Sequence, residues 1–287
     1  MTAAPARVRR LRRWRLVAAI ACLGLAACAS RGTVFDIVHG TPAFDRATIA
    51  GYKADRFVAG RFTASDGTVL PYRLLVPDRI APGKRYPLVV QFHNSGGIGS
   101  DNRLQVDTDA IARSWALPAV RARHPAFVIA PQFATRSANY DDPEHPAVSH
   151  AAPPLATALE LVASVMAEHP VDRQRVYAVG YSMGGSTTWQ ALLAAPTLFA
   201  AGMPVSGIAP DRAHATALAG MPLLVLHGDA DPENPIDADR AMVAAIRAAG
   251  GRTVRMREYV GLEHDFPGDL VPGDWWRDWL FAQHRSP

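Results

Sequence analysis

Short apolar runs alternate with amphipathic stretches along most of this chain. The apolar runs that predict strands are 69–76, 88–92, 127–130, 175–180, 223–226 and 253–259. The stretches with helical spacing are 154–168, 183–195, 237–249 and 275–283. Strands that alternate with helices indicate βαβ units, so the pattern predicts an α/β fold with a mostly parallel sheet and helices on both faces.

Segment 133–153 interrupts this alternation. It is rich in Asp, His and Pro, and it is too long for an ordinary connection between elements. Because it follows a strand end, we expect it to form one wall of a substrate cleft. Its acidic and histidine side chains match no metal-ligand spacing, so we predict a solvated loop and neither a metal nor a cofactor.

The first 27 residues have the layout of a bacterial signal peptide. Six arginines precede an apolar stretch, about 16–27, that is too short to span a bilayer permanently. We interpret 1–27 as a leader, 28–55 as a tether without clean periodicity, and 56–287 as one catalytic domain. The stretch ends at Leu25-Ala26-Ala27-Cys28, and the alternative is an ordinary signal peptide followed by a chance cysteine.

The leader changes the meaning of the charge. The whole chain has 30 basic and 26 acidic residues, a net charge of +4, but the leader holds six of the basic residues and no acidic one. The remainder therefore carries about −2, and the pI of 9.3 does not indicate a nucleic-acid partner. Cys22 lies in the leader and Cys28 directly follows it, so no disulfide is expected in the rest of the chain.

The motif G-x-S-x-G occurs around Ser182, in the sequence GYSMG. A predicted strand precedes it and a predicted helix follows it, which is the context of a nucleophile elbow. The sharp turn lifts the serine Oγ clear of the sheet, and flanking glycines avoid clashes with neighbouring elements. An alcohol is a weak nucleophile until a base takes its proton. We therefore predict Ser182 as a nucleophile that needs a histidine and an acid.

Two later loops supply these partners. Asp231 is the preferred acid because it lies in a loop after strand 223–226, at the carboxyl end where catalytic groups gather. Asp229 is the alternative, although it can instead cap the turn. His264 follows strand 253–259 and is the only histidine between the acid and the final helix, so we predict it as the general base. His227 precedes the acid at a strand end and is predicted to be structural.

Stabilising an oxyanion requires two backbone N–H groups. Met183, directly after the nucleophile, is one predicted donor. The other is expected from the small-residue loop 93–99 after strand 88–92, where we select the amide of Ser95.

With these residues placed, the chain resembles the esterase and predicted-peptidase branch of the α/β-hydrolases. That branch neighbours phospholipase/carboxylesterases, dienelactone hydrolase-like proteins, feruloyl esterases and polyhydroxybutyrate depolymerases. The resemblance runs from about Gly60 to the C-terminus, through PLVVQFHNSGG, VDRQRVYAVGYSMGG and HGDADPENP. It implies the same triad and oxyanion donors, namely Ser182, Asp231, His264, Ser95 and Met183.

This chain differs from the family pattern at one position, and its predicted nucleophile differs from that of one member activity. The family usually has glycine after the first histidine of the oxyanion loop, where this chain has Asn94. Dienelactone hydrolases proper use a cysteine nucleophile, so Ser182 argues against that activity.

Leu25-Ala26-Ala27-Cys28 resembles the lipobox of bacterial lipoproteins. The resemblance implies cleavage before Cys28 and a diacylglyceryl group on its thiol. Ala29, rather than Asp, follows it, and this favours the outer membrane with the protein facing the periplasm.

These features predict a serine hydrolase that cleaves carboxylic esters through an acyl-enzyme. Its substrate would be a small-molecule or polymer-derived ester. One alternative is a peptidase of the same fold, and another is a non-catalytic envelope binding lipoprotein, which loss of a triad residue would favour.

Overall fold

The computed structural model describes residues 1–2, 35–40, 43–144 and 147–285. The chain divides into Met1–Gly32 and Thr33–Pro287, and the second unit contains the helices and strands described below. Residues 3–27 of the predicted leader and Cys28 lie outside the described residues. No helix in the described ranges is both long enough and apolar enough to cross a membrane.

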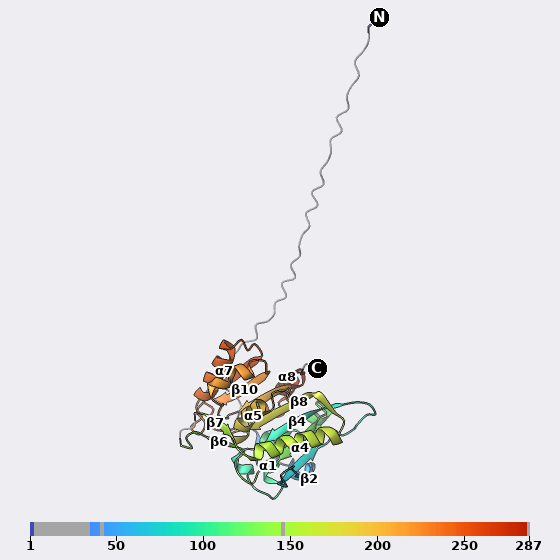
Figure 1. The fold of residues 1–287 in the computed structure, drawn as a ribbon, viewed down its shortest axis with the longest axis vertical. Helices are drawn as coiled ribbons and strands as arrows, with labels where there is room; N and C mark the ends of the chain where they lie inside the picture. Colours follow the sequence, from blue (N-terminus) through green and yellow to red (C-terminus); the bar gives the residue numbers. More distant parts are fainter. Residues whose placement is uncertain (3–34, 41–42, 145–146, 286–287) are drawn as a thin grey trace. The chain divides into compact units, whose positions relative to one another are not determined.

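A sheet of nine strands forms the centre of the folded unit (Figure 1). Its order is β1-β11-β10-β9-β8-β4-β5-β3-β2, and every neighbouring pair is parallel except β2–β3 and β3–β5. The strands are β1 (Phe35–Val38), β2 (Val58–Thr63), β3 (Val69–Leu75), β4 (Tyr86–Phe92), β5 (Phe127–Pro131), β8 (Val171–Tyr181), β9 (Ala201–Val205), β10 (Leu223–Gly228) and β11 (Val254–Tyr259). The predicted α/β fold with a mostly parallel sheet is confirmed.

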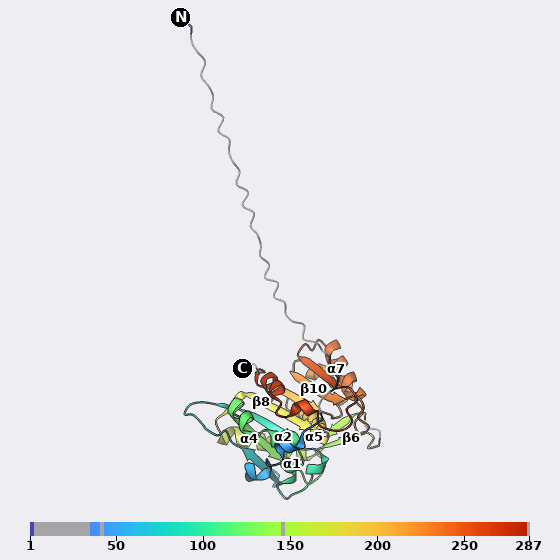
Figure 2. The same ribbon diagram turned by 180° about the vertical axis from the view of Figure 1, so that it is seen from behind.

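Helices cover both faces of this sheet. One hydrophobic cluster joins the sheet to α4 (Pro154–Glu168), α5 (Met183–Ala194), α6 (Ala215–Leu218) and α7 (Asp237–Ala248). A second cluster joins it to α1 (Leu104–Asp107), α2 (Ala110–Ser114), α3 (Pro118–Arg123) and α8 (Asp274–Phe281). Figure 1 labels α4 and α5, and the view from behind in Figure 2 labels α2. Short 3-10 helices occur at η1 (Arg46–Ile49), η2 (Ala54–Arg56), η3 (Ser95–Gly97), η4 (Arg212–His214) and η5 (Gly268–Leu270).

The central strands are apolar on both sides because both sides are covered. In β4, Leu88 and Val90 pack in the first cluster, whereas Val89 between them packs in the second. Such strands have continuous apolar runs rather than alternating ones. This explains why LVVQF was visible as a strand in the sequence.

The folded unit begins earlier than the sequence indicated. Segment 28–55 was expected to be a tether, but β1 pairs in parallel with β11, from Phe35↔Met256 to Val38↔Tyr259. Ile49 and Ala54 are also buried. A strand of four residues at a sheet edge is too short to produce a clear period, so only its pairing with a segment more than 200 residues away defines it.

Strands β2 and β9 were also not predicted. The sequence of β9, AGMPV, contains Gly and Pro, which are depleted in strands, yet all five of its residues are buried between β8 and β10. Its strand conformation is a consequence of burial in the sheet.

Segment 133–153 contains structure of its own. A small hairpin, β6 (Ala138–Tyr140) with β7 (Ser149–Ala151), packs on α5. The hydroxyls of Ser137 and Thr187 are 2.7 Å apart, and Gln190 Nε2 donates to the carbonyl of Ser149 over 2.8 Å. The segment is therefore anchored to the helix that follows Ser182.

Candidate active site

Ser182 lies at the junction of β8 and α5, with φ 57° and ψ −122°. This positive φ is unusual for a residue with a side chain and stores backbone strain. The surrounding backbone holds it, since Ser182 N–H donates to the carbonyl of Val205 over 2.9 Å. A Cβ at Gly180 would overlap the carbonyl of Gly184, and one at Gly184 would overlap that of Phe92. The two glycines of the motif therefore allow the turn.

The structure brings together the three side chains expected to form a triad. His264 Nε2 lies 2.8 Å from Ser182 Oγ, and His264 Nδ1 lies 2.7 Å from Asp231 Oδ2. An ionised carboxylate only accepts, so Nδ1–H donates to Asp231 and Nε2 accepts from the serine hydroxyl. The ring of Tyr181 stacks on His264 with centroids 5.2 Å apart. Ser182 and Asp231 are each 8% exposed, so this line of contacts is largely shielded from water.

The surroundings of Asp231 favour its ionised form. Burial alone would raise the pKa of this carboxyl, but hydrogen bonds from His227 and His264 outweigh that effect and lower the pKa. Its Oδ1 also accepts from the amides of Glu233 and Asn234, over 2.9 and 2.8 Å. Asp231 therefore remains a carboxylate at neutral pH and can stabilise an imidazolium at His264.

The alternative acid, Asp229, has a different role. Its Oδ1 accepts from Gly261 N–H over 2.6 Å, so it binds the backbone at the start of the histidine loop rather than the imidazole ring. The geometry thus distinguishes two aspartates that lie two positions apart in the sequence.

His227 is fully buried, and its Nδ1 lies 2.8 Å from Asp239 Oδ2. Asp239 was not among the residues predicted from the sequence. A signal was present, because Asp239 precedes Met242 and Val243 by three and four residues and therefore shares the buried face of α7. A charged residue on an apolar helix face indicates a buried partner.

The two predicted oxyanion donors each begin a helix: Met183 begins α5 and Ser95 begins η3. The first N–H groups of a helix have no carbonyl partner within it, so these amides are available to a ligand. Asn94, the departure from the family pattern, has a structural role in this loop. Its Oδ1 accepts from Gly96 N–H over 2.9 Å and its Nδ2 donates to the carbonyl of Thr108 over 3.2 Å. An asparagine here caps the loop that glycine would leave free.

His93 holds the same loop in place through its ring nitrogens. It is fully buried, and burial lowers its pKa to about 4, so the ring is neutral. Its Nε2 accepts from Phe133 N–H over 3.1 Å, and its Nδ1 lies 2.6 Å from the carbonyl of Asn94, to which it donates. The oxyanion loop is thereby linked to the start of segment 133–153.

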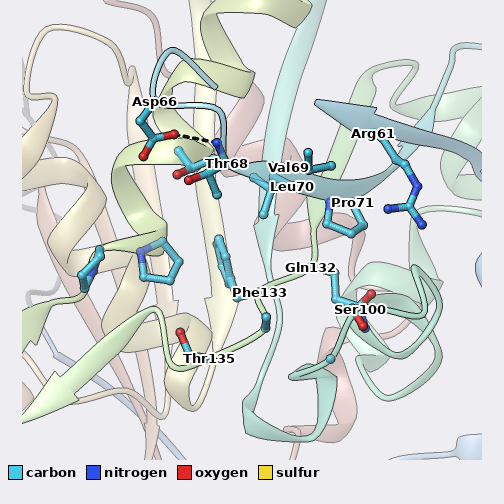
Figure 3. Close-up of a pocket in the computed structure, with 15 residues that line it drawn as sticks. Arg61, Asp66, Thr68, Val69, Leu70, Pro71, Ser100, Gln132, Phe133 and Thr135 are labelled. Atoms are coloured by element: carbon cyan, nitrogen blue, oxygen red, sulfur yellow. Dashed lines mark hydrogen bonds between the residues drawn. The ribbon is translucent and has the colours of Figure 1, made fainter. Parts of the chain in front are cut away.

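A pocket of about 390 Å³ lies beside this loop (Figure 3). It is lined by the start of β3, the residues after β5, the end of the oxyanion loop and the start of α4. The lining residues include Leu70, Phe133, Ala134, Pro153 and Thr157. Figure 3 shows Phe133 below Thr68 and above Thr135, with Gln132 and Ser100 to its right. Both ends of segment 133–153 thus line a pocket, but none of the three triad side chains does.

The acidic and histidine residues of segment 133–153 form no metal site in the part that is described. No group of three or more His, Cys, Asp or Glu side chains placed to hold a metal occurs among the described residues of the chain. Asp141 instead accepts from Val148 N–H over 2.9 Å and so closes the hairpin. His145 lies outside the described residues.

Comparisons with known proteins agree with this fold. Residues 80–272 match the model of the dienelactone hydrolase family. A thermostable esterase of known structure is 32% identical, with a TM-score of 0.70 over 81% of this chain and 64% of that one. The curated proteins include no match.

Two peptidases share the fold at 17% identity. They are a putative dipeptidyl aminopeptidase IV from Bacteroides ovatus (TM-score 0.56; 78% of this chain, 35% of that one) and a puromycin-hydrolyzing peptidase from Mycobacterium tuberculosis (TM-score 0.58; 79% and 40%). This chain therefore spans less than two thirds of each structural relative. The predicted resemblance to the α/β-hydrolases is confirmed: the chain belongs to the dienelactone hydrolase family and has the α/β-hydrolase fold.

Proposed function

We propose that this protein hydrolyses carboxylic esters through an acyl-enzyme on Ser182. The observation that carries the proposal is the unbroken line of hydrogen bonds from Ser182 Oγ through His264 to Asp231, at 2.8 and 2.7 Å. Nucleophile, base and orienting acid are thereby in contact before any substrate binds.

The reaction follows from these contacts. His264 Nε2 takes the Ser182 proton while Oγ bonds to the ester carbonyl carbon, and the amides of Ser95 and Met183 bind the resulting oxyanion. The C–O bond to the alcohol then breaks, and the imidazolium gives its proton to the leaving oxygen. Water attacks the acyl-enzyme with His264 again as base, which releases the acid and restores Ser182.

The pocket beside the oxyanion loop favours an ester with an apolar part. Its walls include Leu70, Phe133, Ala134 and Pro153, and its position next to the loop lets an extended substrate occupy it. The loop and pocket are joined directly, since Gly99 N–H donates to the carbonyl of Phe133 over 2.9 Å. We infer that this pocket receives the apolar end of a small-molecule or polymer-derived ester.

Peptide cleavage is the second candidate, because two peptidases share the fold. Amide cleavage requires more of the site, since the leaving amine must be protonated and an extended chain held in register. The relative that is more similar to this chain is an esterase. We therefore assign esters as the substrate class.

The first test uses a fluorophosphonate probe. Wild-type protein is expected to be labelled, and Ser182→Ala should abolish both labelling and ester turnover. Ser65→Ala, at an exposed serine that contacts Glu160, is the matched control and should keep both. Labelling that survives in Ser182→Ala would show that another residue is the nucleophile.

A second test separates esters from peptides. kcat/KM is measured for an ester and an amide with the same acyl group, beside a peptide library. We expect turnover of the ester and little of the amide. Efficient peptide cleavage that disappears in Ser182→Ala would replace the esterase assignment and keep the nucleophile.

A further inference from the structure

A second buried acid–histidine pair, His227 and Asp239, lies behind Asp231. The Nε2 of His227 is 2.8 Å from the carbonyl of Asn234 and 3.4 Å from Asp231 Oδ2, while its Nδ1 faces Asp239. The other oxygen of Asp239 accepts from the indole N–H of Trp189 over 3.0 Å. Polar contacts thus run without a break from α5, the helix that follows the nucleophile, to the acid of the triad.

The proton positions in this pair follow from its acceptors. A carbonyl only accepts, so Nε2 of His227 carries a hydrogen. A second proton lies between Nδ1 and Asp239 Oδ2, because two acceptors would repel each other at 2.8 Å. The pair therefore has no net charge, whichever partner holds that proton. This neutrality is what allows Asp239 to be fully buried.

The surroundings keep this second proton in place at neutral pH. Burial alone would lower the pKa of His227, but hydrogen bonds to Asp231 and Asp239 outweigh burial and raise the pKa to about 9. His227 is thus a permanent donor toward the turn that carries Asp231.

We propose that His227 and Asp239 are positioning residues that hold Asp231 in line with His264. His227 binds the carbonyl of Asn234, and the amide of Asn234 binds Asp231 Oδ1 over 2.8 Å. Asp239 in turn fixes the orientation of the His227 ring. His227 thereby holds the turn from Asp231 to Asn234 on one side, while His264 binds Asp231 on the other. This inference rests on the proposed function, in which Asp231 acts through His264.

A purely structural role for His227 and Asp239 makes a different prediction. If the pair only stabilised the fold, changing Asp239 would alter stability whether or not Asp231 is present. If the pair acts through Asp231, its effect on the rate must disappear once Asp231 no longer works. A double-mutant cycle measures this difference.

The cycle compares wild type, Asp239→Asn, Asp231→Asn and the double variant in ester hydrolysis. Asp239→Asn keeps the side-chain volume but removes the carboxylate that accepts from both His227 and Trp189. We expect it to lower kcat about tenfold with KM little changed, and to lower kcat less than about twofold in the Asp231→Asn background. Asp237→Asn, on the same helix with its side chain 86% exposed, is the matched control and should change neither background.

A spectroscopic measurement accompanies the kinetics. The proton between His264 Nδ1 and Asp231 Oδ2 should give a downfield ¹H resonance, because the two atoms are 2.7 Å apart. Asp239→Asn is expected to move or broaden this resonance, and Asp237→Asn to leave it unchanged. If Asp239→Asn does not fold, Trp189→Phe replaces it in both measurements, since it removes only one donor to Asp239.

An equal loss of kcat in both backgrounds, or no loss in either, would overturn the positioning role. The proposed function fails separately, when wild-type protein is not labelled by fluorophosphonate and hydrolyses no ester. A wild type that hydrolyses esters while the cycle is additive leaves the function standing and removes this inference.

Discussion

The chemistry at the residue scale depends on strain and on shielding from water. Ser182 has a positive φ that few non-glycine residues adopt, and its amide is fixed by Val205. Asp231 accepts from two amides and from His264, and these hydrogen bonds stabilise its negative charge. Because the groups are already oriented, the proposed attack by Ser182 would need little reorganisation.

The two aspartates of the HGDAD motif provide a residue-scale prediction. Asp231→Asn should lower kcat by about 10³- to 10⁴-fold, because an amide at this position neither fixes the required imidazole tautomer nor stabilises the imidazolium. Asp229→Asn should lower kcat less than about tenfold, since it affects only a hydrogen bond to Gly261. Steady-state kinetics of both variants check the assignment, and the reverse order of losses would make Asp229 the acid.

At the scale of elements, the site is built where parallel strands end. Ser182 follows β8, Asp231 follows β10, His264 follows β11, and the oxyanion loop follows β4. Strands that run in the same direction bring these ends to one edge of the sheet, where loops can converge on a substrate. The pocket continues this edge beyond β5, where segment 133–153 begins.

The pocket can be tested by filling it from α4. Thr157 lines it and is 7% exposed, so Thr157→Trp should occupy the space meant for the apolar end of the substrate. kcat/KM for long-chain p-nitrophenyl esters should fall at least about tenfold, while that for the acetate ester stays nearly constant. Ala156→Trp, at the exposed neighbouring position, is the control. An unchanged ranking of chain lengths would show that substrate does not enter this pocket.

A buried acid at the start of α2 predicts a dependence of stability on pH. Asp109 is fully buried and caps the helix by accepting from Ala112 N–H over 2.9 Å. Burial raises its pKa to about 7, against a partial opposing effect of the amides of Ala112 and Ile111. Between pH 4 and 7 the unfolded chain releases this proton while the folded protein keeps it. The free energy of unfolding therefore falls as pH rises through this window.

Asparagine at position 109 keeps the cap but cannot ionise. Asp109→Asn should therefore match wild type near pH 4 and exceed it at pH 8, on the order of 2–4 kcal/mol in free energy of unfolding. Asp109→Ala, which removes the cap, should lose about 1 kcal/mol relative to Asp109→Asn at both pH values. Urea unfolding at the two pH values measures these free energies of unfolding. A difference between Asp109→Asn and wild type that does not change with pH would contradict the raised pKa.

At the scale of the whole molecule, the sheet separates two hydrophobic cores. Its parallel strands also place their amino ends along one side and their carboxyl ends along the opposite side. Because β1 runs parallel to β11, it starts at the edge opposite the one that carries Ser182. The chain therefore enters the folded unit on the side away from the site. Only residues 28–34 of the predicted tether precede β1, since the folded unit already includes Phe35–Val38.

We propose that Cys28 carries a lipid that places this protein in the outer membrane, facing the periplasm. Cys28→Ser should abolish incorporation of labelled fatty acid and move the protein from the membrane to the soluble fraction, with ester hydrolysis retained. Cys22→Ser, inside the predicted leader, is the matched control and should still be lipidated. A wild-type protein without lipid in the soluble fraction would favour an ordinary signal peptide.

Local signals in the sequence were sufficient for the main architecture and for the turn at Ser182. Buried parallel strands are long apolar runs, helices have a period of 3.6, and the elbow has glycines at fixed offsets from Ser182. Each of these signals lies within about 15 consecutive residues, so no knowledge of distant contacts was needed. Asp231 and His264 were then predicted as partners of Ser182 because each follows the end of a later strand.

Only the tertiary structure decided what depends on contact between distant segments. β1 is a strand because β11 lies beside it, and β9 is one despite Gly and Pro because β8 and β10 enclose it. Asp231 rather than Asp229 faces His264, and Asp239 meets His227, because loops and a helix from separate parts of the chain converge. A hydrogen bond is a matter of tenths of an ångström between atoms, whereas a sequence pattern specifies only which face or strand end a residue occupies.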